Sequence, residues 1–166
     1  CLTGVPNDIN DDCIDLVAAY LSTDPDVLDT LEFYKVTNGS GIGDYGTHAV
    51  SLALQRNTHV TNLNLLSNNI GRQGATALAT MLKTNSTITD INLRSNKIGD
   101  DSALEIALGI VQNKTLEELY LDENNISDRG CISLAESLCT NKTLKVLHLR
   151  SNAIGLIGIE AFAKAL

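Results

Sequence analysis

The sequence predicts an α/β solenoid in which short parallel strands line a concave face and helices cover the convex face. Three observations lead to this prediction. One pattern, L-x-x-L-x-L-x-x-N-x-I, recurs at a constant interval of 28 residues, starting at Val60, Ile88, Leu116 and Leu144. The residues after each copy are apolar at helical spacing. Hydrophobic residues make up 43% of the chain but aromatic residues only 4%, and uniform aliphatic layers suit stacked, similar units.

Each copy of the pattern begins with a strand. Apolar and polar residues alternate, as in Leu63-Asn64-Leu65 and Leu147-His148-Leu149, which predicts a strand with one buried face. We expect five strands, near residues 28–34, 60–66, 88–94, 116–122 and 144–150. The residues between the core positions of each strand should then face the concave side.

An asparagine occupies one fixed place after each strand. These residues are Asn68, Asn96, Asn124 and Asn152. The chain must turn out of the strand there, which leaves backbone groups without partners, and an Asn side chain offers both a donor and an acceptor to its own and the neighbouring turn. We interpret the four residues as a structural Asn ladder. The isoleucine two positions later should fill the core below each turn.

The second half of each unit is predicted to be helical. Its apolar and small residues recur at helix spacing, for example Ala75, Leu78, Ala79 and Leu82. A small residue at the equivalent positions of Gly74, Gly130 and Gly158 lets each helix start close to the preceding turn. The helices are followed by Asn57, Asn85, Asn113 and Asn141. We expect these asparagines to end the helices in the left-handed conformation.

The same period extends toward the N-terminus with one interruption. Gly46 lies 28 residues before Gly74, but the strand near Leu28 sits four residues early, which indicates a four-residue insertion in residues 34–41. Residues 1–27 are expected to form an N-terminal helical cap or half repeat, and residues 28–166 a domain of five strand–helix repeats. Because solenoids need a polar cap and no strand follows the last helix, we expect the parent chain to continue beyond Leu166.

The repeat length, the Asn ladder and the helices that end in Leu-x-x-Asn resemble the ribonuclease-inhibitor-like class of leucine-rich repeats. The resemblance covers about residues 28–166, and the units look most similar to the uniform repeats of NOD-like receptors. The class also includes the GTPase-activating protein of Ran and the C-terminal domain of tropomodulin. The resemblance implies a right-handed α/β horseshoe that acts as a cytoplasmic scaffold for protein binding.

The charge distribution narrows the classes of partner. The net charge is −8, and residues 1–30 hold seven aspartates and no Lys or Arg, whereas the rest of the chain is close to neutral. Such a chain has no electrostatic footprint for nucleic acid or for an anionic membrane, and no stretch is long and apolar enough to span a bilayer. We therefore expect a protein partner, no nucleic acid and no membrane.

No residue pattern points to catalysis, a cofactor or a metal. The three histidines, His48, His59 and His148, lie in different repeats without ligand spacing. The glycine-rich residues 39–43 lack the Lys-Ser/Thr of a phosphate-binding loop. Asp8-x-Asn10-x-Asp12 lacks the Gly and Glu that would complete a calcium loop. We predict that the chain is not an enzyme and carries no cofactor and no metal.

The leading hypothesis is a non-catalytic scaffold, part of a larger receptor or regulator, that binds a protein on its concave face. The alternatives are a tropomodulin-like actin-binding module and a GTPase-regulating module. The candidate binding residues are Tyr34, Asn64, Leu66, Asn92, Arg94, Glu118, Tyr120, Asp122, His148 and Arg150. Tyr and Arg are enriched in interface hot spots. An equal alternative is that Arg94, Asp122 and Arg150 form a charge ladder that only stabilises the sheet.

Cysteines and glycosylation triplets bear on the compartment. Cys131 and Cys139 lie eight residues apart in one predicted helix, which is about 12 Å and too far for a disulfide. Five N-x-S/T triplets favour an extracellular location, but those at Asn85, Asn113 and Asn141 share one repeat position that a helix-to-strand turn explains. We favour the cytoplasm and keep an extracellular recognition repeat as the alternative.

Overall fold

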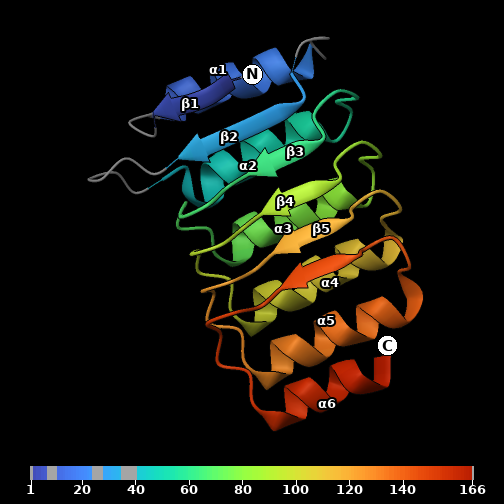
Figure 1. The fold of residues 1–166 in the computed structure, drawn as a ribbon. Coiled ribbons are helices and arrows are strands. Elements are labelled where there is room, and N and C mark those ends of the chain that lie inside the picture. Colours follow the sequence, from blue (N-terminus) through green and yellow to red (C-terminus); the bar gives the residue numbers. More distant parts are fainter. Residues whose placement is uncertain (1, 7–10, 24–27, 35–40, 166) are drawn as a thin grey trace.

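The computed structural model describes residues 2–6, 11–23, 28–34 and 41–165, and strands alternate with helices along the whole of this chain (Figure 1). The strands are β1 (Leu2–Pro6), β2 (Thr30–Tyr34), β3 (Asn62–Asn64), β4 (Asp90–Asn92), β5 (Glu118–Tyr120) and β6 (Val146–His148). The helices are α1 (Asp11–Ser22), α2 (Gly43–Leu54), α3 (Arg72–Leu82), α4 (Asp100–Gln112), α5 (Asp128–Thr140) and α6 (Leu156–Ala165).

All the strands belong to one parallel sheet, in the order in which they follow one another along the chain. From β3 onward the register keeps a constant step, because Leu63 pairs with Ile91, Ile91 with Leu119, and Leu119 with Leu147. Equivalent residues of successive repeats therefore lie side by side. The helices stack against the other side of the sheet (Figure 1). The predicted α/β solenoid is confirmed.

Strand β1 was not predicted from the sequence. It pairs in parallel with β2, where Leu2 aligns with Leu31 and Val5 with Phe33, and the register shifts between these two pairs. Gly4 and Pro6 interrupt the alternation that marks the other strands, and Pro is tolerated because β1 is an edge strand. The N-terminal segment thus contributes a strand as well as the expected helix. The insertion predicted in residues 34–41 lies mostly outside the described residues.

The core is a continuous strip between the sheet and the helices. Leu63, Ile91 and Leu119 sit at one position of successive strands and are at most 1% exposed. The isoleucines after the Asn ladder, such as Ile70 and Ile98, are fully buried beneath the turns. Burial of one such side chain stabilises the fold by about 1.5–3 kcal/mol, so each repeat adds a similar layer to the one before it.

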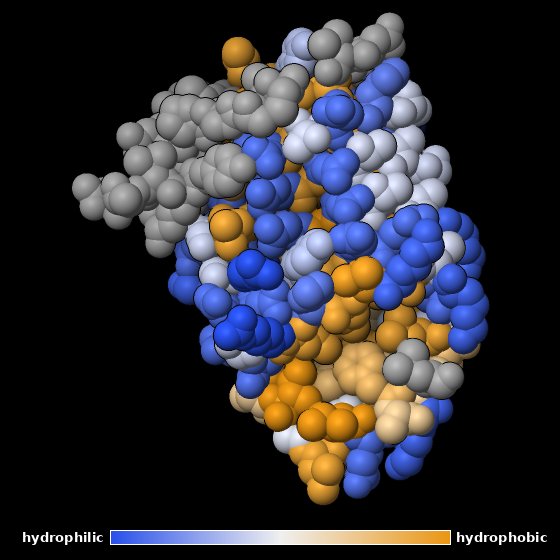
Figure 2. Space-filling view, in the orientation of Figure 1, coloured by the Kyte–Doolittle hydropathy of each residue, from blue (hydrophilic) through white to orange (hydrophobic). Residues whose placement is uncertain are grey.

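The C-terminal end of the strip is more open than its middle. A hollow of about 310 Å³ there is lined by Leu138, Leu144, Lys145, Val146, Leu147, Leu149 and Phe162. Hydrophobic side chains dominate this end of the molecule (Figure 2), and Leu156 and Ile157 of α6 are 70% and 63% exposed. No helix within the described ranges has the length and apolar character needed to cross a membrane.

Gly109 lies where α4 packs against α3. A Cβ atom at this position would stand 2.9 Å from the Cα and 2.9 Å from the carbonyl oxygen of Ala79. Because backbone atoms cannot rotate away, we expect Gly109→Ala to lower the free energy of unfolding by about 1–2 kcal/mol, even though alanine favours helix. Urea unfolding measures this loss. Gly99→Ala is the matched control, since its Cβ would meet nothing within 4 Å, and equal losses in both variants would contradict the packing argument.

Candidate protein-binding site on the concave face

The Asn ladder fixes the turns that border the concave face. Oδ1 of Asn96 accepts the N–H groups of Asn68 and Ile70 at 3.0 and 2.9 Å. Its Nδ2 donates to the carbonyl oxygens of Leu65 and Leu93, each at 2.9 Å. The side chain therefore joins its own turn to the preceding repeat. The residue before each rung of the ladder is left-handed, with φ values of 56–59° at Ser67, Ser95, Glu123 and Ser151.

The turns at the other ends of the strands, where each helix leads into the next strand, are held by the asparagines that follow the helices. Asn113 and Asn141 have φ values of −70° and −76° and extended backbones, so the prediction of a left-handed conformation is wrong at both. The side chain does the capping instead. Oδ1 of Asn113 accepts the N–H groups of Thr115 and Leu116, while Nδ2 donates to the Leu82 carbonyl oxygen at 2.8 Å. With these backbone groups already paired, the turn needs no left-handed residue.

The same geometry bears on glycosylation. Nδ2, the atom that would carry a glycan, donates to a backbone carbonyl oxygen at Asn85, Asn113 and Asn141. These three residues are only 2–5% exposed. A glycan at any of them would break the capping hydrogen bonds and has no room in the folded chain.

The register of the sheet gathers the predicted concave-face residues into rows. One row, called here the central row, runs from Glu32 through Asn64, Asn92 and Tyr120 to His148, each aligned with the next across the strands. A second row beside it contains Glu118 of β5. Leu66, Arg94, Asp122 and Arg150 form a third row in the turns just after the strands. Tyr34 belongs to β2, but its side chain lies outside what the structure describes.

A shallow hollow of about 370 Å³ opens on the concave face beside the central row. It is lined by Thr30, Glu32, Asn62, Leu63, Asn64, Asp90, Asn92 and Tyr120. Carboxylates and amides dominate this lining. Among the residues that the structure describes, no three His, Cys, Asp or Glu side chains are arranged to hold a metal ion. The hollow is wide and open, and its chemistry suits contact with polar side chains of another molecule.

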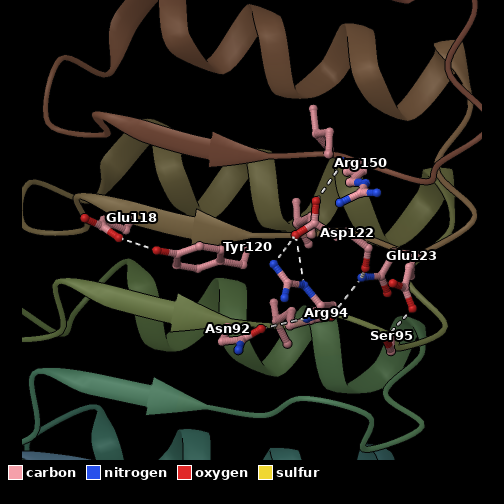
Figure 3. Close-up of polar contacts among 12 residues, drawn as sticks. Asn92, Arg94, Ser95, Glu118, Tyr120, Asp122, Glu123 and Arg150 are labelled. Atoms are coloured by element: carbon pink, nitrogen blue, oxygen red, sulfur yellow. Dashed lines mark hydrogen bonds and ion pairs between the residues drawn. The ribbon is translucent and has the colours of Figure 1, made fainter.

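Tyr120 and His148 form a stacked pair in the central row. Their ring centroids lie 4.7 Å apart with an interplanar angle of 20°. The Tyr120 hydroxyl donates a hydrogen bond to Oε2 of Glu118 at 2.5 Å (Figure 3). This hydrogen bond, with burial, raises the pKa of Tyr120 above its ordinary value. The pair is a rigid aromatic surface with a polar tip, which is the kind of side chain that anchors interfaces.

Asp122 is a buried part of the scaffold. It is 3% exposed, and Oδ2 accepts from Nε and Nη2 of Arg94 at 3.0 and 2.8 Å, while Oδ1 accepts from the main-chain N–H of Arg150 at 2.7 Å (Figure 3). Burial alone would raise the pKa of Asp122, but these hydrogen bonds outweigh it, and the pKa is lowered. The charge-ladder alternative thus matches the geometry for Arg94 and Asp122, whereas Arg150 contributes its backbone.

Three further aspartates, which the sequence pattern did not single out, connect successive repeats. Oδ1 of Asp44 accepts the N–H groups of Gly71 and Gly74, and Asp100 and Asp128, 56 and 84 residues later, accept the equivalent N–H groups of the repeats that follow them. Each carboxylate therefore caps the start of the next helix, where the helix dipole favours negative charge. The recurrence of Asp at this repeat position, broken by Arg72, is the sequence feature that could have revealed this role.

The family assignment follows from the repeats. The Leucine Rich repeat family model matches residues 56–79, 84–107, 112–135 and 140–163, which together are more than half of the chain. The chain belongs to the leucine-rich-repeat family. Its fold and its exposed polar concave face are those of a scaffold for protein interaction.

Two solved structures have folds similar to that of this chain. Leiomodin-1 Actin-Binding Site 2 (ABS2) is 26% identical, with a TM-score of 0.75 over 92% of this chain and 88% of that chain. The tropomodulin C-terminal domain of Caenorhabditis elegans is 14% identical, with a TM-score of 0.72 over 92% of this chain and 90% of that one. The second similarity concerns the fold alone. A comparison with curated protein sequences gives no significant match.

Proposed function

We propose that this chain is a non-catalytic actin-binding module. The observation that carries the proposal is the similarity to Leiomodin-1 Actin-Binding Site 2, which extends over nearly the full length of both chains. A solenoid of this kind offers a broad surface rather than an enclosed pocket. The actin-binding alternative of the sequence analysis is therefore preferred to a receptor scaffold.

The concave face is the proposed contact surface. The stacked Tyr120 and His148, on the last two strands β5 and β6, provide an aromatic anchor toward the C-terminal end of this face, and Arg150 is exposed beside it. Arg94 is held in one orientation by the buried carboxylate of Asp122, yet its side chain is 42% exposed. A pre-oriented Arg next to a rigid aromatic pair loses little conformational entropy on binding.

The cytoplasm is the proposed compartment. Cys131 is buried and Cys139 exposed, and both are free thiols, which is typical of proteins kept in a reducing environment. Burial raises the pKa of the Cys131 thiol, and the nearby Asp128 adds to this effect. The capping roles of Asn85, Asn113 and Asn141 account for three of the five N-x-S/T triplets, which weakens the argument for a glycosylated, extracellular protein.

Sedimentation with actin filaments tests the function, and binding to monomeric actin is measured in parallel by calorimetry. We expect the chain to bind at least one of the two forms. The double variant Tyr120→Ala/His148→Ala should bind at least about tenfold more weakly, because truncation of an aromatic anchor in an interface costs about 2 kcal/mol or more.

Tyr20→Ala is the matched control, because Tyr20 is 48% exposed on α1, away from the concave face. It should bind actin as the unmodified chain does. If neither form of actin binds, actin is not the partner. If actin binds but the double variant retains full affinity, the contact surface lies elsewhere on the solenoid. Charge reversal at Asp122 is unsuitable as a binding test, because the carboxylate is buried and its loss would destabilise the fold.

A further inference from the structure

A positively charged surface lies along the side of the solenoid where helices end and strands begin. Its exposed cations, called here the basic edge, are Arg56, Lys83, Lys114, Lys142 and Lys145. They are five of the 12 Lys and Arg residues, whereas the four turns that carry them (residues 54–61, 82–89, 110–117 and 138–145) hold only one of the 20 acids, Glu117. In a chain of net charge −8, this edge is a local region of opposite sign.

The fold does not require lysines here. Lys114 and Lys142 occupy the middle of the N-x-T turn in adjacent repeats, and the same place is taken by Thr58 and Ser86 in the earlier repeats. The flanking asparagines already pair the backbone of each turn. Like charges at neighbouring positions of adjacent repeats repel one another. The repulsion between Lys114 and Lys142 therefore opposes the stability of the fold.

The helix dipole explains the positions of only some of the basic-edge cations. Cations are favoured near helix C-termini, and Nζ of Lys142 donates to the carbonyl oxygen of Leu138 in the last turn of α5 at 3.2 Å. Lys145 lies beyond that turn and pairs with Glu117 at 2.6 Å. Within the described part of the chain, the side chains of Arg56, Lys83 and Lys114 make no hydrogen bond or ion pair. Their positive charges are left for solvent or for a partner.

A hollow of about 380 Å³ lies within the basic edge. It is lined by Ser86, Thr87, Thr89, Lys114, Thr115, Glu117, Lys142, Thr143 and Lys145. The lining includes three lysines, several hydroxyl groups and one carboxylate, that of Glu117, which pairs with Lys145. Ammonium and hydroxyl groups are donors that bind carboxylates in hydrogen bonds. The right-hand edge in Figure 2 is strongly hydrophilic at this level of the solenoid.

We propose that the basic edge docks an acidic segment of a protein, with Glu or Asp side chains meeting Lys114 and Lys142. A short segment fits better than a polyanion or a bilayer, because the positive region is narrow and the rest of the chain is negative. This surface is separate from the concave face. The proposal does not depend on the identity of the concave-face partner.

The test uses a fluorescent peptide of alternating Glu and Ser and the full chain, with binding followed by anisotropy. We expect saturable binding that weakens as NaCl is raised from about 50 to about 300 mM. Lys114→Gln/Lys142→Gln should bind about fivefold more weakly, as expected for the loss of two exposed ion pairs. Lys97→Gln/Lys164→Gln is the matched control, because it removes the same charge from exposed lysines outside the basic edge.

The outcomes separate this proposal from the others. If the peptide binds equally weakly to Lys114→Gln/Lys142→Gln and to Lys97→Gln/Lys164→Gln, the effect is one of net charge and the proposal is overturned. A lack of peptide binding to the unmodified chain would also overturn it. If the chain floats with phosphatidylserine vesicles and does not bind the peptide, the basic edge binds a membrane surface and the proposal is overturned. Tyr120→Ala/His148→Ala should keep full affinity for the peptide. A failure of the actin proposal is thus distinguishable from a failure here. Circular dichroism confirms that each variant is folded.

Discussion

Asn96→Ala should lower the free energy of unfolding by about 3 kcal/mol, because a buried backbone donor left without an acceptor costs about 1–3 kcal/mol. Two such donors, the N–H groups of Asn68 and Ile70, depend on Oδ1 of Asn96. Two carbonyl oxygens, of Leu65 and Leu93, would lose the hydrogen bonds they accept from Nδ2. Asn96 is 7% exposed, so water cannot easily replace the side chain.

Urea unfolding followed by far-UV circular dichroism measures this loss. In a solenoid each repeat is stabilised by its neighbours, so a weak link in the centre should also reduce cooperativity and lower the m-value. The neighbouring Lys97→Ala is the control, because its side chain is exposed, and a change within about 0.5 kcal/mol is expected there. A loss below about 1 kcal/mol at Asn96 would mean that the ladder contributes little to the fold.

The fold was largely predictable because the repeat carries the same information several times. Leu63 and its equivalents alternate with polar residues, and this alternation fixes both the strands and the face that each side chain takes. Strand β1 escaped prediction because it occurs once, and Gly4 and Pro6 hide its alternation. A single irregular edge strand is specified by pairing with its neighbour, which no local pattern records.

The two sets of asparagines show a different limit. Asn96 and Asn113 have the same side chain, and each was expected to satisfy a turn. Composition alone cannot decide whether the backbone becomes left-handed or the side chain supplies the hydrogen bonds. At Asn113 the side chain does so, and the backbone stays extended. Left-handed residues occur in the other turn of the repeat, at Ser95 and its equivalents, one position before each asparagine of the ladder.

The candidate surface was predictable in outline and less so in detail. Strand alternation placed Asn64, Asn92, Tyr120 and His148 on one face, and the register then aligned them in the central row. Pairing within the third row depends on side-chain rotamers, which the period does not encode. The basic edge could have been found by aligning the turns of successive repeats, because Lys114 and Lys142 then fall at one position.

Asp122→Asn should destabilise the fold by about 2 kcal/mol at neutral pH, since hydrogen bonds to charged groups contribute about 1.5–3 kcal/mol. The carboxylate is 3% exposed and accepts three hydrogen bonds from Arg94 and Arg150. Asparagine keeps one acceptor for the Arg150 N–H but loses the charge that pairs with Arg94. Because the Arg94 side chain is 42% exposed, water solvates the guanidinium that is left unpaired, and the loss stays well below that of an isolated buried charge.

The effect of this substitution should depend on pH in one direction. The pKa of Asp122 is lower in the folded chain than its ordinary value, which is about 3.9 in an unfolded chain. As the pH falls, Asp122 therefore takes up its proton in the unfolded chain before it does so in the folded chain. The stabilisation by the ionised carboxylate is complete above about pH 5 and is lost as the pH falls through the pKa of Asp122 in the folded chain. The difference in unfolding free energy between the unmodified chain and Asp122→Asn should shrink steadily below about pH 4. Glu136→Gln, at an exposed position on α5, is the control for the loss of one carboxylate, and its unfolding free energy should stay within about 0.5 kcal/mol of the unmodified chain at neutral pH. A difference for Asp122→Asn that stays constant from neutral pH to about pH 3 would contradict the assignment of the Arg94–Asp122 pair as a charge-dependent support of the concave face.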